Sequence, residues 1–148
     1  MITPKKTLPR GIRNNNPLNI RVGNVWQGEV KKPTDSAFEQ FISMKWGVRA
    51  AFVILRRYIK RYGHNTIRSI VSTWAPTNEN NTNAYVDFVA KRTRLNPDMP
   101  IRFDDKATMV AIVSAMIWQE NGQGIDERII EDAYEMAHLL CQKEGLLC

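Results

Sequence analysis

Residues 109–122 read MVAIVSAMIWQENG, and this stretch decides the fold. Its first ten residues are apolar except for Ser114, so a helix formed here has almost no polar face. Such a helix lies in the centre of a core, and the apolar run is too short to cross a bilayer. Gly is the residue type that most often ends a helix. We therefore expect a buried central helix that ends at Asn121 and Gly122.

Further helices are predicted around this central one from apolar residues repeated at helical spacing and from residues that cap helices. Asp104 or Asp105 is expected to begin the central helix, and Asn81 or Thr82 to cap the one before it. Thr66 and Asp126 are the expected caps of two more. The expected helices other than the central one cover residues 46–63, 66–74, 81–89 and 126–140.

Residues 16–42 show a different pattern, which favours short strands. Leu18 and Ile20 alternate with polar neighbours, as β-strands with one buried face do. Gly23-Asn24 and the run KKPTD at 31–35 are typical of turns. The sequence thus predicts a mostly helical α+β domain with a small β-hairpin lobe near the N-terminus. We expect one domain over residues 1–148, with residues 1–9 as a loose arm.

Length and composition are those of one folded domain. The chain has 148 residues, of which 43% are hydrophobic and 24% charged, and this mixture excludes disordered and fibrous classes. Residues 1–103 carry 18 Lys and Arg against 6 Asp and Glu, whereas residues 104–148 carry 3 against 9. The basic part is expected to be drawn to a polyanion, namely nucleic acid, an anionic membrane surface or an acidic cell-wall polymer.

Glu120 is the candidate for chemistry, because it lies at the C-terminal end of the predicted central helix. Partial burial and the negative end of the helix dipole both disfavour its charged form, so its pKa should be raised. A raised pKa is what a general acid needs at neutral pH. The alternative is a frayed helix end with an exposed glutamate.

A second cluster of interest lies in RGIRNNNPLNIR at residues 10–21. Three Asn before a Pro favour a loop whose amides face a polar ligand. Trp26 and Trp74 offer flat apolar surfaces that stack on sugar rings or bases. The alternative is that the asparagines only form turns and that both tryptophans belong to the core.

Several motifs of the sequence resemble those of bacterial enzymes that cleave glycans. The segment NNPLNIR at 15–21, followed by WQG at 26–28 and FEQF at 38–41, resembles a segment of bacterial glucosaminidases with a lysozyme-like fold. WAP at 74–76 and ENNTNAYV at 79–86 look like late motifs of lytic transglycosylases, and IWQENG at 117–122 is similar to their catalytic-acid helix. The whole chain also resembles small lysozyme-like or virion proteins of phages and mobile elements. The motif order differs from the usual one, which implies a circular permutation.

The resemblance implies cleavage of the β-1,4 glycosidic bond between MurNAc and GlcNAc in peptidoglycan glycan strands, by a lytic transglycosylase or a muramidase. Glu120 would be the general acid, and Tyr85 would orient or protect it. Asp35, Glu29 and Glu39 are the candidates for a second carboxylate. The residues expected to bind substrate are Asn16, Asn19, Arg21, Trp26, Trp74, Glu79 and Asn121. Glu79 matches a glutamate of the late motif, although a capping role is the alternative.

Two alternative functions are compatible with the sequence. The first is a non-catalytic virion or glycan-binding protein of the same fold, and the second is a basic nucleic-acid-binding domain, for which no motif is found. His64 and His138 have no ligand-spaced partner, so no metal or cofactor is expected. No apolar stretch follows the first lysines, so we expect no signal peptide, synthesis in the cytoplasm, and delivery to the wall or periplasm by lysis, a phage particle or a secretion apparatus.

Overall fold

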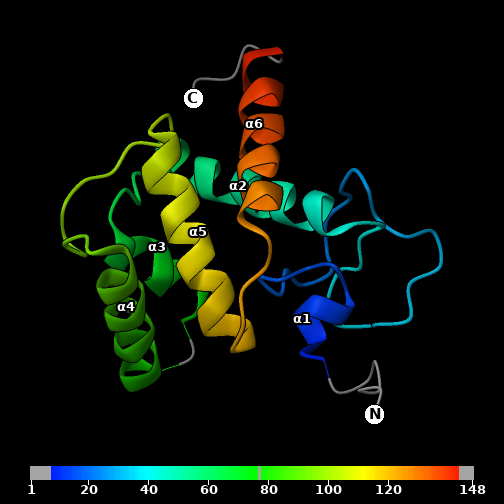
Figure 1. Ribbon diagram of the computed structural model, residues 1–148, viewed down its shortest axis with the longest axis horizontal. Helices are drawn as coiled ribbons and strands as arrows, with labels where there is room; N and C mark the ends of the chain where they lie inside the picture. Colours follow the sequence, from blue (N-terminus) through cyan, green and yellow to red (C-terminus); the bar gives the residue numbers. More distant parts are fainter. Residues whose placement is uncertain (1–7, 77, 144–148) are drawn as a thin grey trace.

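The computed structural model describes residues 8–76 and 78–143, without the side chains of residues 79, 80 and 140–143. Residues 1–7 of the predicted N-terminal arm therefore lie outside the described part. The described residues form six helices joined by turns and irregular loops (Figure 1). These are α1 (Arg10–Arg13), α2 (Met44–Arg61), α3 (Ile67–Trp74), α4 (Glu79–Thr93), α5 (Lys106–Asn121) and α6 (Glu127–Lys143). The prediction of a mostly helical architecture is confirmed.

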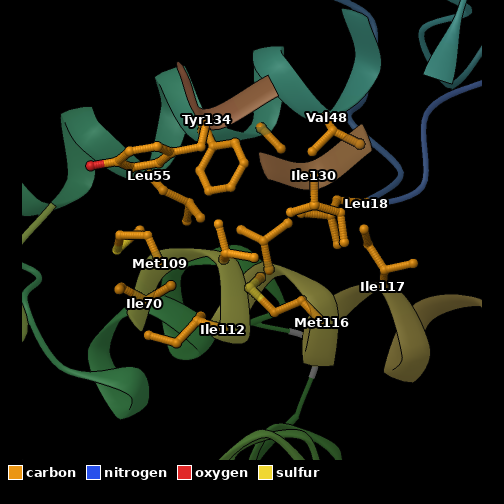
Figure 2. Packing of buried hydrophobic residues seen from close by; sticks show 14 of the residues in the cluster. Leu18, Val48, Leu55, Ile70, Met109, Ile112, Met116, Ile117, Ile130 and Tyr134 are labelled. Atoms are coloured by element: carbon orange, nitrogen blue, oxygen red, sulfur yellow. The ribbon is translucent and has the colours of Figure 1, made fainter. Parts of the chain in front are cut away.

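Helix α5 lies in the middle of the molecule, as its apolar sequence predicts. Helix α4 packs against one side of it and α6 against another, while α2 packs against α6 (Figure 1). Figure 2 shows side chains of α2, α3, α5 and α6 meeting in one apolar layer. Asp105 caps α5 by accepting a hydrogen bond from the Thr108 N–H, and Gly122 ends it in the left-handed conformation. No described helix combines the length and apolar character needed to cross a bilayer.

Capping residues also set the starts of α3 and α4, with one correction. Thr66 caps α3, as predicted, and forms a capping box with Ser69. Helix α4 begins at Glu79 and is capped by Asn78, whose side chain accepts from the Asn81 N–H. The prediction that Asn81 or Thr82 caps this helix was wrong, because Asn78 is the earlier of several capable residues and its cap adds another turn.

The segment from residue 14 to residue 42 does not form the expected strands. Within the described residues its β-pairing consists of two isolated antiparallel bridges, Arg21 with Phe38 and Glu29 with Phe41. A few backbone hydrogen bonds, such as that from the Ile42 N–H to the Gly28 carbonyl, still hold its parts side by side. A regular hairpin lobe is therefore not confirmed.

Side chains explain why the pairing stays irregular. The Asn16 side-chain amide occupies the Ile20 N–H and the carbonyls of Ile20 and Glu39. The Asp35 carboxylate accepts from the N–H groups of Ala37 and Phe38. These polar side chains compete with a strand ladder for the same backbone groups. The alternation of apolar residues predicted which side chains are buried but not that strands would form.

The start of α2 packs directly on the backbone of the Asn-rich loop. Gly47 lies in the first turn of α2, and a Cβ atom at this position would overlap the carbonyl oxygen of Asn15. The approach of helix and loop therefore depends on the missing side chain at Gly47.

This close approach can be tested by whether Gly47→Ala raises or lowers the stability of the fold. In an open helix, Gly→Ala stabilises by about 1 kcal/mol. We expect Gly47→Ala instead to destabilise by about 2 kcal/mol, because the loop must move to admit the methyl group. Chemical denaturation of both proteins measures this difference. A variant as stable as the wild type would contradict the packing described here.

Candidate active site

Glu120 lies in the last turn of α5, where two other parts of the chain bind its carboxylate. The Asn19 side-chain amide donates to Oε1 over 2.9 Å, and the Tyr85 hydroxyl donates to Oε2 over 3.1 Å. Asn19 belongs to the loop after α1, and Tyr85 belongs to α4. Glu120 is thus held in one orientation, rather than exposed at a frayed helix end.

The surroundings of Glu120 favour its protonated form. Burial raises the pKa of Glu120, and the hydrogen bonds from Asn19 and Tyr85 partly oppose this rise. Tyr85 is only 5% exposed, and burial together with the neighbouring Glu120 charge holds the pKa of its hydroxyl well above the usual value. Tyr85 therefore stays protonated and remains a donor. A carboxyl group with these properties can give up a proton and later take one back.

The position of Asn19 depends on the way its loop docks on the end of α5. The Asn121 side-chain amide donates to the Pro17 carbonyl over 2.7 Å and to the Ile117 carbonyl over 2.9 Å. Asn19 itself adopts a left-handed backbone with φ of 55°, which asparagine tolerates better than most residues. Asn121 was predicted to bind substrate, but the structure gives its amide group a positioning role.

Asn16 is likewise a structural residue. It is fully buried, and its amide oxygen and nitrogen are engaged with Ile20 and Glu39. No atom of this side chain can reach a ligand, so the prediction that Asn16 lines a substrate cleft was wrong. The sequence pattern indicated correctly that the asparagines form a loop, but not which of them would face outward.

Four of the predicted binding residues meet in one groove. Asn19, Arg21, Trp26 and Trp74 line a cavity of about 320 Å³. The Trp74 ring is fixed there by a hydrogen bond from its Nε1–H to the Leu18 carbonyl, over 3.2 Å. Asn19 belongs both to this groove and to the Glu120 site, so the two are neighbours.

Arg57 and Tyr58 also line the groove, although sequence reasoning missed them. Both lie on α2, where Tyr58 fits the apolar stripe and Arg57 is one of several basic residues. The period of a helix predicts which residues face the core. It does not show that another segment leaves a groove beside them, and no other signal in the sequence marks these two residues.

Asp35, predicted as a second carboxylate, is engaged elsewhere. The Arg10 guanidinium contacts both of its oxygens at 2.6 and 2.7 Å, and Asn14 donates to it over 2.9 Å. Arg10 and Asn14 hold the pKa of Asp35 well below its usual range. Among the described contacts, none links Asp35 to the Glu120 site. Asp35 therefore organises its own loop, and we do not retain it as a catalytic residue.

Glu29 and Glu39, the remaining candidates, form a carboxyl pair. Glu39 is 8% exposed, and burial together with contact to Glu29 raises the pKa of Glu39 to about 7. Glu29 also accepts a hydrogen bond from the Trp26 N–H over 3.0 Å. Glu39 is therefore only partly ionised at neutral pH, so it is less suited than an ordinary carboxylate to stabilise a positively charged intermediate.

Two further expectations concern Glu79 and metal binding. Glu79 is the first residue of α4, and only its backbone belongs to the described part of the chain. Its proposed role in the site therefore stays a prediction. Within the described residues, no group of three or more His, Cys, Asp and Glu side chains is placed to hold a metal ion.

Comparison with known proteins places the chain in a phage protein family. No family model matches it. Protein P5 of Pseudoalteromonas phage PM2 is 42% identical over 117 residues, which cover 76% of this chain and 71% of that protein. The chain therefore belongs to the family of this phage protein. The name of the relative states no activity, so the function must be argued from the site.

The hydrogen bond from Asn19 leads to a prediction about the pKa of Glu120. Asn19→Gly removes the donor and tolerates the left-handed backbone. We expect the pKa of Glu120 to rise further, because a hydrogen bond to the charged form is lost. An NMR titration of the Glu120 side-chain carboxyl carbon measures the shift.

Asn15→Gly is the matched control for this titration. Asn15 has a similar φ of 54°, and its amide donates to the Phe41 carbonyl instead of to Glu120. This variant should leave the pKa of Glu120 unchanged. Equal shifts in the two variants would show that loop distortion, and not the lost donor, is responsible.

The carboxyl pair predicts how stability depends on pH. The raised pKa of Glu39 means that the folded protein keeps a proton that the unfolded chain releases between about pH 4.5 and 7, so this group lowers stability as the pH rises through that window. Glu39→Gln should raise stability at pH 8 by about 1 kcal/mol, with a smaller gain at pH 4.5.

Thermal unfolding at the two pH values checks this prediction. Glu131→Gln, which changes an exposed glutamate on α6, should show no such pH dependence. A gain from Glu39→Gln that is the same at both pH values would contradict the assignment.

Proposed function

We propose that this protein cleaves the β-1,4 glycosidic bond between MurNAc and GlcNAc in peptidoglycan, with Glu120 as the general acid. The proposal rests on the surroundings of the Glu120 carboxyl group. Asn19 and Tyr85 hold this group by hydrogen bonds, and burial raises its pKa. Beside it lies a groove with the rings of Trp26 and Trp74, which offer stacking surfaces for sugars.

In the proposed reaction, Glu120 transfers its proton to the glycosidic oxygen while the bond from that oxygen to C1 breaks. The leaving sugar departs as an alcohol, and positive charge develops at C1 and the ring oxygen. Glu120 is then a carboxylate and can accept a proton from the attacking hydroxyl group. Tyr85 keeps the carboxylate oriented through both steps.

The attacking group decides between two reaction types. Asp35 is bound to Arg10 and Glu39 is buried with its pKa raised to about 7. Among the described hydrogen bonds of Glu120, which come from Asn19 and Tyr85, none involves Asp35, Glu29 or Glu39. This favours the lytic transglycosylase route, in which the 6-hydroxyl of the muramyl sugar attacks C1 with help from the N-acetyl group. Its product is a 1,6-anhydro sugar, whereas attack by water would give a reducing end.

The wider expectations about fold and setting belong to the same proposal. A lysozyme-like fold with circularly permuted motifs accounts for an acid-bearing helix, α5, that follows the Tyr85 motif in the chain. The phage relative supports the link to phages, and we propose that the protein meets the wall during infection or release. We propose further that the protein is made in the cytoplasm and later reaches the wall in a particle or through a lesion. A glycan-binding virion component is the alternative when cleavage is absent.

Digestion of purified peptidoglycan tests the proposal. Wild type and Glu120→Gln are incubated with the wall, and the soluble fragments are identified by mass spectrometry. We expect 1,6-anhydro-muropeptides from the wild type and a rate about 10²–10⁴-fold lower from Glu120→Gln, which lacks the acid. Reducing-end products would indicate hydrolysis instead.

Glu131→Gln is the control in this assay, since it makes the same chemical change at an exposed site on α6. It should retain wild-type activity. If wild type and Glu120→Gln both bind the wall and release nothing, the enzymatic proposal is wrong and the binding-protein alternative replaces it.

A further inference from the structure

The groove beside Glu120 contains two cationic side chains in addition to its aromatic rings. Arg21 comes from the loop after α1 and Arg57 from α2, and both line the cavity and are exposed. No Asp or Glu is among the described residues that line it. The groove therefore presents two guanidinium groups with no carboxylate of its own between them.

Neither arginine takes part in an ion pair within the described part of the chain. Other exposed arginines do: Arg10 is bound to Asp35, Arg68 to Asp98 and Arg102 to Asp104. A guanidinium group that has no ion-pair partner among the described residues keeps its hydrogen-bond donors for a charged ligand. Its planar fork also matches the geometry of a carboxylate.

Arg21 is nevertheless held in place. Its guanidinium carbon lies 4.9 Å from the centre of the Phe38 ring, and its backbone is bridged to Phe38. Stacking on a ring covers the face of the guanidinium and leaves the N–H groups at its edge free to donate. Arg21 is therefore partly preorganised, which lowers the entropy lost when a ligand binds.

The aromatic wall of the groove is also rigid. Trp74 is fixed by the hydrogen bond from its Nε1–H to the Leu18 carbonyl, and Tyr58 meets it edge to face with ring centres 6.1 Å apart. A flat ring next to two guanidinium groups fits a sugar ring that bears an acidic substituent. A neutral sugar would use the ring and leave both charges unused.

We propose that the groove is a subsite for a sugar unit that carries a carboxylate, and that Arg21 and Arg57 determine this specificity. The inference rests on the proposed glycan cleavage, because Asn19 joins the groove to Glu120. The chemistry selected is a carboxylate on a β-1,4-linked amino-sugar chain, supplied either by the lactyl ether of MurNAc or by its attached peptide. Uncharged N-acetylglucosamine polymers should be poor ligands.

Calorimetric titration of Glu120→Gln, in which turnover is expected to be strongly reduced, tests this inference. The three probes are chitotetraose, a peptide-free tetrasaccharide of alternating GlcNAc and MurNAc, and the same tetrasaccharide with peptides attached. We expect at least one carboxylate-bearing probe to bind about tenfold more tightly than chitotetraose, which corresponds to about one charge-assisted hydrogen bond. The stronger of these two probes identifies which carboxylate is recognised.

Substitutions in the same background assign the preference to the two arginines. Arg21→Gln and Arg57→Gln should each remove most of it by weakening the binding of the carboxylate-bearing probes much more than that of chitotetraose. Arg61→Gln is the matched control, because Arg61 is an exposed arginine one turn further along α2 that does not line the groove. It should preserve the preference.

Three results would overturn the inference: equal affinity for charged and neutral probes, no binding of any probe, or tighter binding of a single-stranded oligonucleotide lost in the same two variants. The last would identify a nucleic-acid groove. Failure of the proposed catalysis is a separate outcome. In that case the wild type releases no fragments, yet the arginine-dependent preference for carboxylates remains.

Discussion

The docking of one loop on the end of one helix determines the geometry of the candidate site. The Asn121 amide, in the last turn of α5, donates to the carbonyl of Pro17 in the loop after α1. This contact joins residues 104 positions apart in the chain and places Asn19 against the Glu120 carboxylate. Gly11 packs against the same junction, where an added Cβ would lie 2.7 Å from the Asn121 amide oxygen. The junction thus positions Asn19, which belongs to both the candidate site and the groove.

The junction is built at some cost to stability. Glu120 is a partly buried carboxyl group, Glu39 is buried beside another carboxyl, and the amide oxygen of Asn121 is buried without a hydrogen-bond partner. Each of these polar groups loses solvation on folding. Sites that perform chemistry often retain such unfavourable groups, because the same burial that destabilises the fold shifts a pKa into a useful range. The apolar layer around α5 offsets this cost (Figure 2).

Much of the helical framework could be predicted from the sequence, because it depends on local rules. The apolar run of α5, the caps Thr66 and Asp105 and the stop at Gly122 act within a few residues. The strands expected between 16 and 42 were not found, because polar side chains such as Asn16 and Asp35 take backbone hydrogen bonds that a ladder would need. The alternation of apolar and polar residues indicates which side chains are buried. It predicts strands only where no polar side chain competes for the backbone hydrogen bonds.

The site was predictable to a similar degree. The end of an apolar helix identified Glu120, and a resemblance in sequence identified Tyr85 as its neighbour. Arg57 could not be found, since its role depends on how α2 faces the Asn-rich loop in three dimensions. Asn16 and Asn19 differ by only three positions, yet one is buried and the other reaches the carboxylate. The turn between them decides this difference, and composition does not encode it.

A crystal structure of Glu120→Gln bound to a tetrasaccharide of alternating GlcNAc and MurNAc tests the central claim most directly. The account predicts a glycosidic oxygen within about 3 Å of the side chain at position 120, with a neighbouring sugar ring stacked on Trp26 or Trp74. A glycan bound elsewhere on the molecule, with the groove empty and position 120 remote from any glycosidic bond, would contradict it.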